Sequence, residues 1–198
     1  TDVTKGDFTG AITVEARGEV ELLKNNLNRM ILTLKETTET NTKQGWLKTN
    51  LSQFSDFMQG KKDLQSLAEV LISELCVVIT AQHGVFYALD RDIDKASKAV
   101  GLKLLASFAY RERKQVSNVF KIGEGLIGQC AREKKRIVVH DVPGDYIKIN
   151  SGLGESKPLN IIVLPVSFED ELIGVVELAS FSRFTEIQLS FLDQLMLS

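Results

Sequence analysis

The sequence predicts an α+β protein, in which an antiparallel sheet with flanking helices is preceded by a long coiled-coil helix. Residues 19–36 carry apolar residues at helical spacing, whereas residues 102–110 alternate apolar and polar residues as a strand does. The segments of strand character lie between helical segments at 64–80 and 185–198. A helix, mostly antiparallel strands with one inserted helix, and a closing helix together form an α+β sandwich.

The composition is that of a globular protein without an electrostatic drive toward nucleic acid. Hydrophobic residues make up 43% of the 198 residues, and the net charge is -2, so we expect no nucleic-acid partner. No apolar run approaches the ~20 residues that a membrane span needs, so we expect no membrane contact within this chain. The chain opens at Thr1 without Met. We therefore expect a cytoplasmic fragment of a longer protein, and the sequence leaves open whether that protein is anchored in a membrane.

An apolar heptad seam runs along the N-terminal helix and predicts a dimer. Its spacing of 3, 4, 3 and 4 residues is that of the a and d positions of a coiled coil, and a second seam follows with spacings of 4, 3 and 4. We expect a parallel homodimer through both seams. The predicted interface is Val20, Leu23, Leu27, Met30 and Leu34 in the first seam and Leu47, Leu51, Phe54 and Met58 in the second.

The two seams are about one residue out of phase. Between them lie the polar and mostly β-branched residues 37–42 and then Gly45, which are weak helix formers. Two interpretations stay open. Either this stretch separates two helices, or one coiled coil contains a change of phase at which its twist can differ between two states.

Two capped helices are predicted to bound the strands. Asp63 is an N-cap candidate for the helix at 64–80, and Thr185 with Gln188 forms a capping box for the closing helix. We expect both helices to lie on one face of the sheet. Their apolar stripes are Leu64, Leu67, Leu71, Leu75 and Val78 in the first helix and Ile187, Phe191 and Leu195 in the second.

The strands between these helices are separated by turns rich in glycine or charge. Residues 159–167 and 171–180 form the strongest hairpin. Residues 142–158 hold three glycines and two of the three prolines, which predicts a long loop. The remaining predicted elements are strands at 83–89, 102–110 and 136–140 and a short helix at 125–134.

Several short motifs resemble those of known signalling modules. The second part resembles a GAF domain of bacterial sensor kinases, on Gly123-Glu-Gly-Leu-Ile-Gly128, Val139-His-Asp-Val-Pro143 with Tyr146, Ser151-Gly-Leu-Gly-Glu155, Leu164-Pro-Val166, Gly174-Val-Val-Glu-Leu178, and Phe184-Thr185 with Phe191-Leu192. The first part resembles the second half of a HAMP domain, on Gly6-Asp7-Phe8, Ile12-Thr-Val-Glu15, Glu19 and Asn28-Arg-Met30. The resemblance divides the chain into a HAMP half at 1–36, a linker helix at 37–62 and a GAF domain at 63–198.

The resemblance implies a signal-sensing and dimerising relay segment of a two-component sensor histidine kinase. Such a segment passes a signal through its HAMP and GAF helices to a downstream kinase in the same parent chain, which starts a phosphorelay from a His in a dimerisation helix. His83 and His140 lie on or beside predicted strands, so we expect no enzymatic activity in this chain itself. The alternative is a GAF relay for another output, such as a cyclic-di-nucleotide synthase, a phosphatase or a transcription activator.

Other candidate chemistry has simpler structural explanations. Gly123, Gly125 and Gly128 match a dinucleotide fingerprint, but glycines also let a chain turn sharply from a strand into a helix. A thiol-based GAF-fold enzyme would need paired reactive cysteines, whereas Cys76 and Cys130 lie in apolar helix stripes. The sequence holds no metal-ligand spacing, and no cofactor is evident.

A small-molecule ligand is compatible with the resemblance, because GAF pockets lie between the sheet and loops such as 141–158. Aromatic and aliphatic walls suit a small, mostly apolar molecule. The alternative is that these side chains fill their own core and the domain is an unliganded relay. The predicted ligand-binding residues are Phe108, Tyr110, Tyr146, Ile147, Ile149 and Val163.

Overall fold

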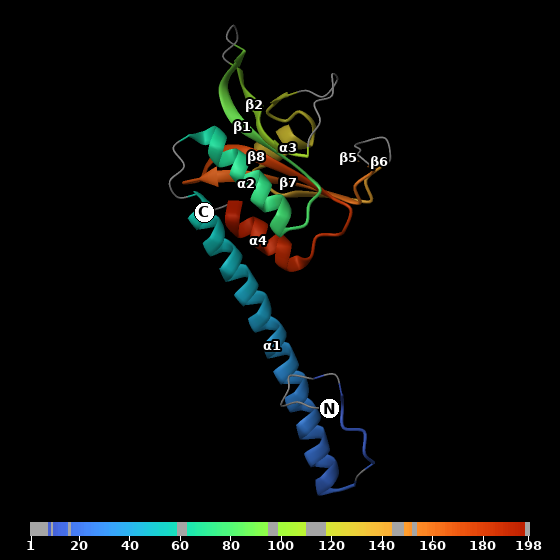
Figure 1. Cartoon of the computed structure of the whole chain (residues 1–198). Helices are drawn as coiled ribbons and strands as arrows, with labels where there is room; N and C mark the ends of the chain where they lie inside the picture. Colours follow the sequence, from blue (N-terminus) through green and yellow to red (C-terminus); the bar gives the residue numbers. More distant parts are fainter. Residues whose placement is uncertain are drawn as a thin grey trace. The chain divides into compact units, whose positions relative to one another are not determined.

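The computed structural model describes residues 8, 10–15, 17–58, 63–94, 99–109, 118–143, 149–151 and 154–196 (Figure 1). The chain divides into two compact units, residues 1–49 and residues 50–198. The boundary falls within helix α1 (Glu19–Met58), so the last residues of this helix belong to the second unit.

Helix α1 is continuous over its 40 residues. Of the two interpretations of the stretch between the seams, the break into two helices is therefore wrong. A helix can accommodate threonines because their hydroxyls bond back to the preceding turn, and the Thr42 hydroxyl donates to the Thr38 carbonyl at 2.9 Å. The other interpretation, a change of phase within one helix, stays a prediction. A shift of one residue would rotate the apolar stripe by about 100° around the helix axis.

In the first unit, one side chain ties the described N-terminal residues to α1. The Asn28 side chain accepts a hydrogen bond from the Ile12 N–H at 2.8 Å and donates one to the Ile12 carbonyl at 3.1 Å. The first predicted seam remains open to solvent, since Val20, Leu27 and Met30 are 61%, 38% and 59% exposed. A partner helix would cover an apolar stripe of this kind.

The second unit is built on a six-stranded antiparallel sheet with the strand order β3-β2-β1-β8-β7-β4. The predicted hairpin is confirmed, since Ile162 lies opposite Leu178 and Phe168 lies opposite Glu171. A separate two-stranded pair consists of β5 (Ile149–Ser151) and β6 (Gly154–Ser156). The strands of the main sheet are β1 (His83–Asp94), β2 (Ala99–Phe108), β3 (Val119–Lys121), β4 (Ile137–His140), β7 (Asn160–Phe168) and β8 (Glu171–Ser180).

Helices cover both faces of this sheet (Figure 1). Helices α2 (Leu64–Val78) and α4 (Glu186–Met196) lie together on one face, as predicted, and α3 (Gly125–Glu133) lies on the other. The Gln188 side chain of α4 donates a hydrogen bond to the Ile79 carbonyl at the end of α2, at 3.0 Å. The predicted α+β class is confirmed, including a long N-terminal helix, while its coiled-coil pairing stays a prediction.

Both predicted helix caps are confirmed. The Asp63 carboxylate accepts a hydrogen bond from the Ser66 N–H at 2.8 Å. The Gln188 side-chain oxygen accepts one from the Thr185 N–H at 2.8 Å, and the Thr185 hydroxyl accepts one from the Gln188 N–H at 3.4 Å. The first N–H groups of a helix have no acceptor within the helix, and these side chains supply one. Helices α2 and α4 therefore begin where the sequence predicts.

The structure differs from the predicted elements in three details. The sequence pattern does not predict β3, because its three residues are too few to show an alternation. The predicted loop at 142–158 contains the strands β5 and β6. The stripe of α2 is rotated, since Leu64 is 48% exposed and the residues that reach the core are Ala68, Ile72, Leu75 and Cys76.

Candidate functional site

The face of the sheet beneath α3 carries a cluster of buried apolar side chains, here named the α3-face cluster. Two of the predicted ligand residues belong to it: Ile149 of β5 and Val163 of β7 are 7% and 0% exposed. Tyr110, Tyr146 and Ile147 lie outside the described residues. The cluster consists of Val85, Tyr87, Leu102, Ile127, Cys130, Ala131, Val142, Ile149, Ile161, Val163, Val175 and Ala179.

Phe108 lies on the opposite face of the sheet from Ile149 and Val163. It pairs with Gly84 across strands β2 and β1. Gly84 faces α2, because a Cβ at this position would lie 2.6 Å from the Cys76 Sγ. Directly opposed residues in neighbouring strands share a face, so the structure does not bring Phe108 together with Ile149 and Val163.

A β-bulge explains this placement. The register of β2 shifts against β1, so that Phe86 lies opposite Ala106 whereas Tyr87 lies opposite Leu104. One extra residue in a strand moves the side chains beyond it to the other face. The alternation that predicts a single apolar face for β2 is therefore split between two faces.

Glu177 is an ionisable residue that stands on the α3 face in the middle of β8. It lies opposite Val85 on one side and Val163 on the other, and both belong to the α3-face cluster. The residue retains partial exposure, and burial raises the pKa of its carboxyl to about 7. None of the described residues forms a hydrogen bond or an ion pair with this carboxyl. Its charge is therefore costly unless a proton or a bound group neutralises it.

Sequence reasoning misses Glu177, although a signal for it exists. Within the motif Gly174-Val-Val-Glu-Leu178, one acidic residue interrupts an apolar strand. Its neighbours two positions away, Val175 and Ala179, are buried on the same face. An acidic residue at an inward position of a central strand is rare in a purely structural role.

The two cysteines lie on opposite faces of the sheet. Cys76 of α2 approaches Gly84 on one face, whereas Cys130 of α3 lies in the α3-face cluster and donates its S–H to the Lys135 carbonyl at 3.2 Å. Burial raises the pKa of each thiol to about 12. Both thiols are held in the protonated, unreactive form, and the sheet keeps them from acting as a pair.

The glycine motif at residues 123–128 forms the tight turn from β3 into α3. Gly125 has a φ of +60°, which residues with a Cβ rarely adopt. Gly128 lies so close to β3 that a Cβ would come within 2.2 Å of the Lys121 carbonyl oxygen. The Gly123 N–H donates to the Gly128 carbonyl at 2.7 Å and closes the turn. Backbone geometry accounts for these glycines without a nucleotide.

Comparison with known proteins identifies the family of this fold. A family model described as the GAF domain matches residues 61–197, which is more than half of the chain. The chain belongs to the GAF family. The GAF domain of a phosphoenolpyruvate-protein phosphotransferase from Coxiella burnetii shares the GAF fold of this chain, with 21% sequence identity and a TM-score of 0.58 over 76% of this chain and 88% of that chain.

Two further solved structures resemble this GAF domain to a similar degree. A GAF sensor protein from Burkholderia vietnamiensis is 20% identical, with a TM-score of 0.57 over 78% of this chain and 85% of that chain. The free methionine-R-sulfoxide reductase from Neisseria meningitidis, in complex with its substrate, is 22% identical, with a TM-score of 0.53 over 74% and 81% of the two chains. At these identities the likeness shows the fold alone. The GAF fold is a small-molecule sensing and regulatory fold, and some relatives that share it are enzymes.

The last turns of α1 pack into the core of the GAF domain. Phe54 is 1% exposed, and the centroid of its ring lies 5.5 Å from that of Phe191 in α4. Phe57 forms a second edge-to-face contact with Phe54, at 6.1 Å. Phe54 is a predicted dimer contact, but in this chain its partner is α4 of the same domain.

The two predicted seams therefore differ in exposure. All members of the first seam are between 38% and 61% exposed, namely Val20, Leu23, Leu27, Met30 and Leu34. In the second seam Leu47, Leu51 and Met58 are half-buried, and Phe54 is buried. Only the first seam offers an open apolar stripe to a partner helix.

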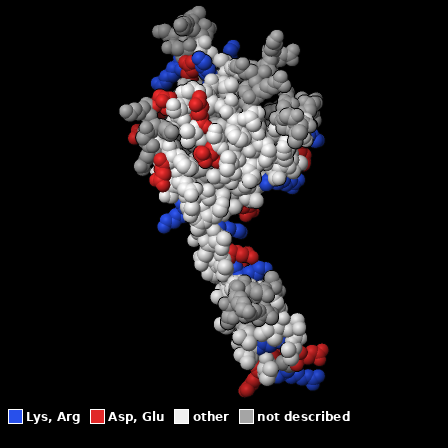
Figure 2. All heavy atoms as spheres, in the orientation of Figure 1, with Lys and Arg blue, Asp and Glu red and all other residues white. Residues whose placement is uncertain are grey.

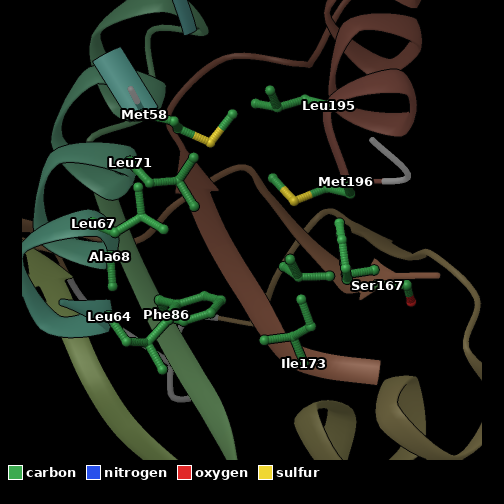
Figure 3. Close-up of a pocket in the computed structure, with 12 residues that line it drawn as sticks. Met58, Leu64, Leu67, Ala68, Leu71, Phe86, Ser167, Ile173, Leu195 and Met196 are labelled. Carbon is green, nitrogen blue, oxygen red and sulfur yellow. The ribbon is translucent and has the colours of Figure 1, made fainter. Parts of the chain in front are cut away.

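A pocket lies on the α2–α4 face of the GAF domain (Figure 3). Figure 3 shows side chains of α2 on one side of it, Leu195 and Met196 of α4 on another, and Phe86 and Ile173 of the sheet beneath. Met58, at the end of α1, lies at its edge. Its lining consists of Met58, Leu64, Leu67, Ala68, Leu71, Phe86, Val166, Ser167, Phe168, Ile173, Leu195 and Met196.

In Figure 2, several Asp and Glu side chains lie near one another on the GAF domain, and the Lys and Arg side chains in view lie mostly toward its edges. In the part of the chain that the structure describes, no helix is long and apolar enough to cross a membrane, and no three His, Cys, Asp or Glu side chains are grouped to hold a metal ion. His140 instead shares a 2.8 Å hydrogen bond with the buried Asn160 side chain.

Proposed function

We propose that this chain is the sensing and dimerising relay segment of a two-component sensor histidine kinase. A parallel homodimer forms through α1 and passes a conformational signal through the GAF domain to a kinase module in the same parent chain. The main support for this proposal is the edge-to-face contact between Phe54 at the end of α1 and Phe191 of α4, both of which are buried in one core.

The contact between Phe54 and Phe191 supports a mechanical connection through the domain. Both rings are buried, at 1% and 0% exposure. Close-packed interiors transmit strain because they compress little, so a rotation of the end of α1 displaces α4 or breaks the contact. A helix that continues from α4 in the parent chain would receive this displacement.

The open seam of α1 supports the dimer. A helix in water gains most of its stability from packing its apolar face, and among the described residues the five apolar side chains of the first seam stay between 38% and 61% exposed. A second copy would cover them in the knobs-into-holes arrangement of a parallel coiled coil.

The α3-face cluster supports a sensed small molecule. Its buried side chains are apolar, and Glu177 supplies one acidic group beside them. Sites of this composition suit a mostly apolar ligand with one hydrogen-bond donor or cationic group. Native mass spectrometry of the purified chain separates this hypothesis from an unliganded relay, because it reports the mass of the dimer and of any retained molecule together.

The other functions considered have weaker support. A thiol-based enzyme is disfavoured by the two buried cysteines on opposite faces, whose pKa values are raised to about 12. A cyclic-di-nucleotide synthase, a phosphatase or a transcription activator would use the same relay and differ only in the output module.

The test uses the natural full-length protein with radiolabelled ATP. We expect phosphate to appear on a histidine, as a linkage that acid cleaves and alkali leaves intact. Leu27→Asp, in the open seam, should lower this labelling, whereas Leu22→Asp, at a more exposed position outside the seam, should leave it unchanged. If no histidine is labelled, the output is not a kinase. Equal labelling of both variants would reject the relay through α1.

A further inference from the structure

The pocket on the α2–α4 face is a second candidate site, separated from the α3-face cluster by the sheet. Its side chains leave a cavity of about 210 Å³ (Figure 3). The floor is deep, since Ala68, Phe86 and Met196 are 1%, 3% and 3% exposed. A close-packed domain core normally leaves few spaces larger than a water molecule.

The lining determines the chemistry of a ligand. Of the twelve described residues that line the pocket, eleven are apolar and one, Ser167, is polar. None of the described residues that line the pocket is charged, so a charged ligand would lose its hydration without compensation from them. An apolar cavity of roughly 150 Å³ holds benzene, so this cavity has room for about eight non-hydrogen atoms.

The pocket explains why part of the apolar stripe predicted to face the core from α2 is not buried. Leu64, Leu67 and Leu71 have the spacing of a core-facing stripe, yet none of them is fully buried. All three line the pocket instead. Their apolar surface gains burial when a molecule occupies the cavity between α2 and α4.

Two methionines give the pocket an adaptable wall. Met58 comes from the end of α1 and Met196 from the end of α4. Unbranched thioether side chains repack easily around ligands of different shape. A molecule seated between them contacts both helices that bound the GAF domain.

We propose that this pocket binds a small, uncharged, apolar molecule of the size of a substituted benzene. The ligand packs between α2, α4 and the sheet and fixes the distance between Met58 and the end of α4. The site is independent of the output module, so it stands whether or not the parent protein is a kinase. Its concave shape and deep floor favour a small molecule over a flat protein surface as the occupant.

The experiment uses ethylbenzene as the probe and methionine methyl groups as reporters. The chain contains three methionines, and Met30 lies in the exposed seam of α1, outside the pocket. With ¹³C-methyl methionine, saturating ethylbenzene should shift the signals of Met58 and Met196 and leave that of Met30 in place. Single Met→Leu variants assign the three signals.

Variants that fill the cavity provide the second arm. Ala68→Leu and, independently, Leu67→Trp should weaken ethylbenzene binding by at least about tenfold, because each places new side-chain atoms in the space of the ligand. Val77→Leu is the control, since this exposed residue of α2 does not line the pocket. Two filling variants guard against one of them failing to fold.

Three results would overturn the proposal. Signals of Met58 and Met196 that do not respond to ethylbenzene would show that the cavity takes no such ligand. An equal response of Met30 would show unspecific binding. Signals that instead change with protein concentration alone would identify a second copy of the chain as the occupant.

Discussion

The two apolar stripes of α1 have similar spacing and different surroundings. The first, at residues 20–34, is exposed along its whole length, whereas the second ends in Phe54 and Met58, which pack into the GAF domain. Heptad spacing therefore indicates that a helix needs an apolar partner, but it does not indicate whether that partner lies in the same chain. For the second stripe that partner includes Phe191 of α4, which lies more than a hundred residues later.

This difference has a direct experimental consequence. Contacts inside the GAF domain stabilise one chain, so their loss should not depend on protein concentration. Contacts in the open seam would stabilise only an assembly, so their loss should be visible as a change in oligomeric state. Each prediction below tests one side of this distinction.

The largest expected effect is that of Phe54→Ala. Removing a fully buried aromatic side chain leaves a cavity and should lower the free energy of unfolding by about 3–5 kcal/mol. Urea unfolding should show the same loss at low and high protein concentration. Phe57→Ala is the control, because Phe57 is 40% exposed and should cost much less. A loss that shrinks as protein concentration rises would instead make Phe54 a contact between chains.

The next effect is that of Leu27→Asp on assembly. A charge placed in a buried seam position has no partner, and we expect the dimer Kd to rise by at least about 100-fold, which corresponds to about 3 kcal/mol. Sedimentation equilibrium should then show a monomer, while urea unfolding of the GAF domain stays unchanged. Leu22→Asp, at a position 65% exposed and outside the seam, should remain a dimer. A Leu27→Asp protein that still dimerises would reject the seam.

Glu177→Gln tests the interior of the domain through pH. The folded-state pKa of about 7 lies above the ordinary value of 4.5, so folding takes up a proton between these values. The stabilisation is complete below pH 4.5 and is lost as the pH rises through 7, by up to about 3 kcal/mol. The Gln variant should therefore be more stable than the natural chain at pH 8 and similar to it at pH 4.5. Glu171→Gln, on the same strand but exposed, should change neither value. Parallel pH profiles for the natural chain and the Glu177→Gln variant would show that the carboxyl is solvated.

The smallest expected effect is that of Thr185→Ala at the start of α4. Loss of the capping hydroxyl should lower the stability of the GAF domain by about 1 kcal/mol, with no effect on the dimer. Thr42→Ala, within the exposed middle of α1, is the matched control and should be neutral or slightly stabilising. Equal effects of the two changes on thermal unfolding would mean that the cap at Thr185 contributes nothing.

Features that depend on residues close in sequence are predicted correctly, whereas features that depend on distant contacts are predicted only in part. The caps at Asp63 and Thr185 and the hairpin of β7 and β8 depend on residues close in sequence, and all three are confirmed. The candidate site depends on contacts between distant residues, and the sequence predicts only some of its members. Ile149 and Val163 share the α3-face cluster, while Phe108 lies on the other face and Glu177 is missed.

The α+β class, the long N-terminal helix, the starts of the capped helices and a family resemblance all follow from the sequence, because periodicity, capping and turn chemistry depend on neighbouring residues. Which face each apolar residue lies on, and which partner it contacts, depends on the tertiary structure. A one-residue bulge in β2 moved Phe108 across the sheet. Phe54, a predicted dimer contact, packs instead against α4 in the domain core. The pairing of β1, β8 and β7 places Glu177 between the buried residues Val85 and Val163. These outcomes depend on register and long-range packing, which no local pattern encodes.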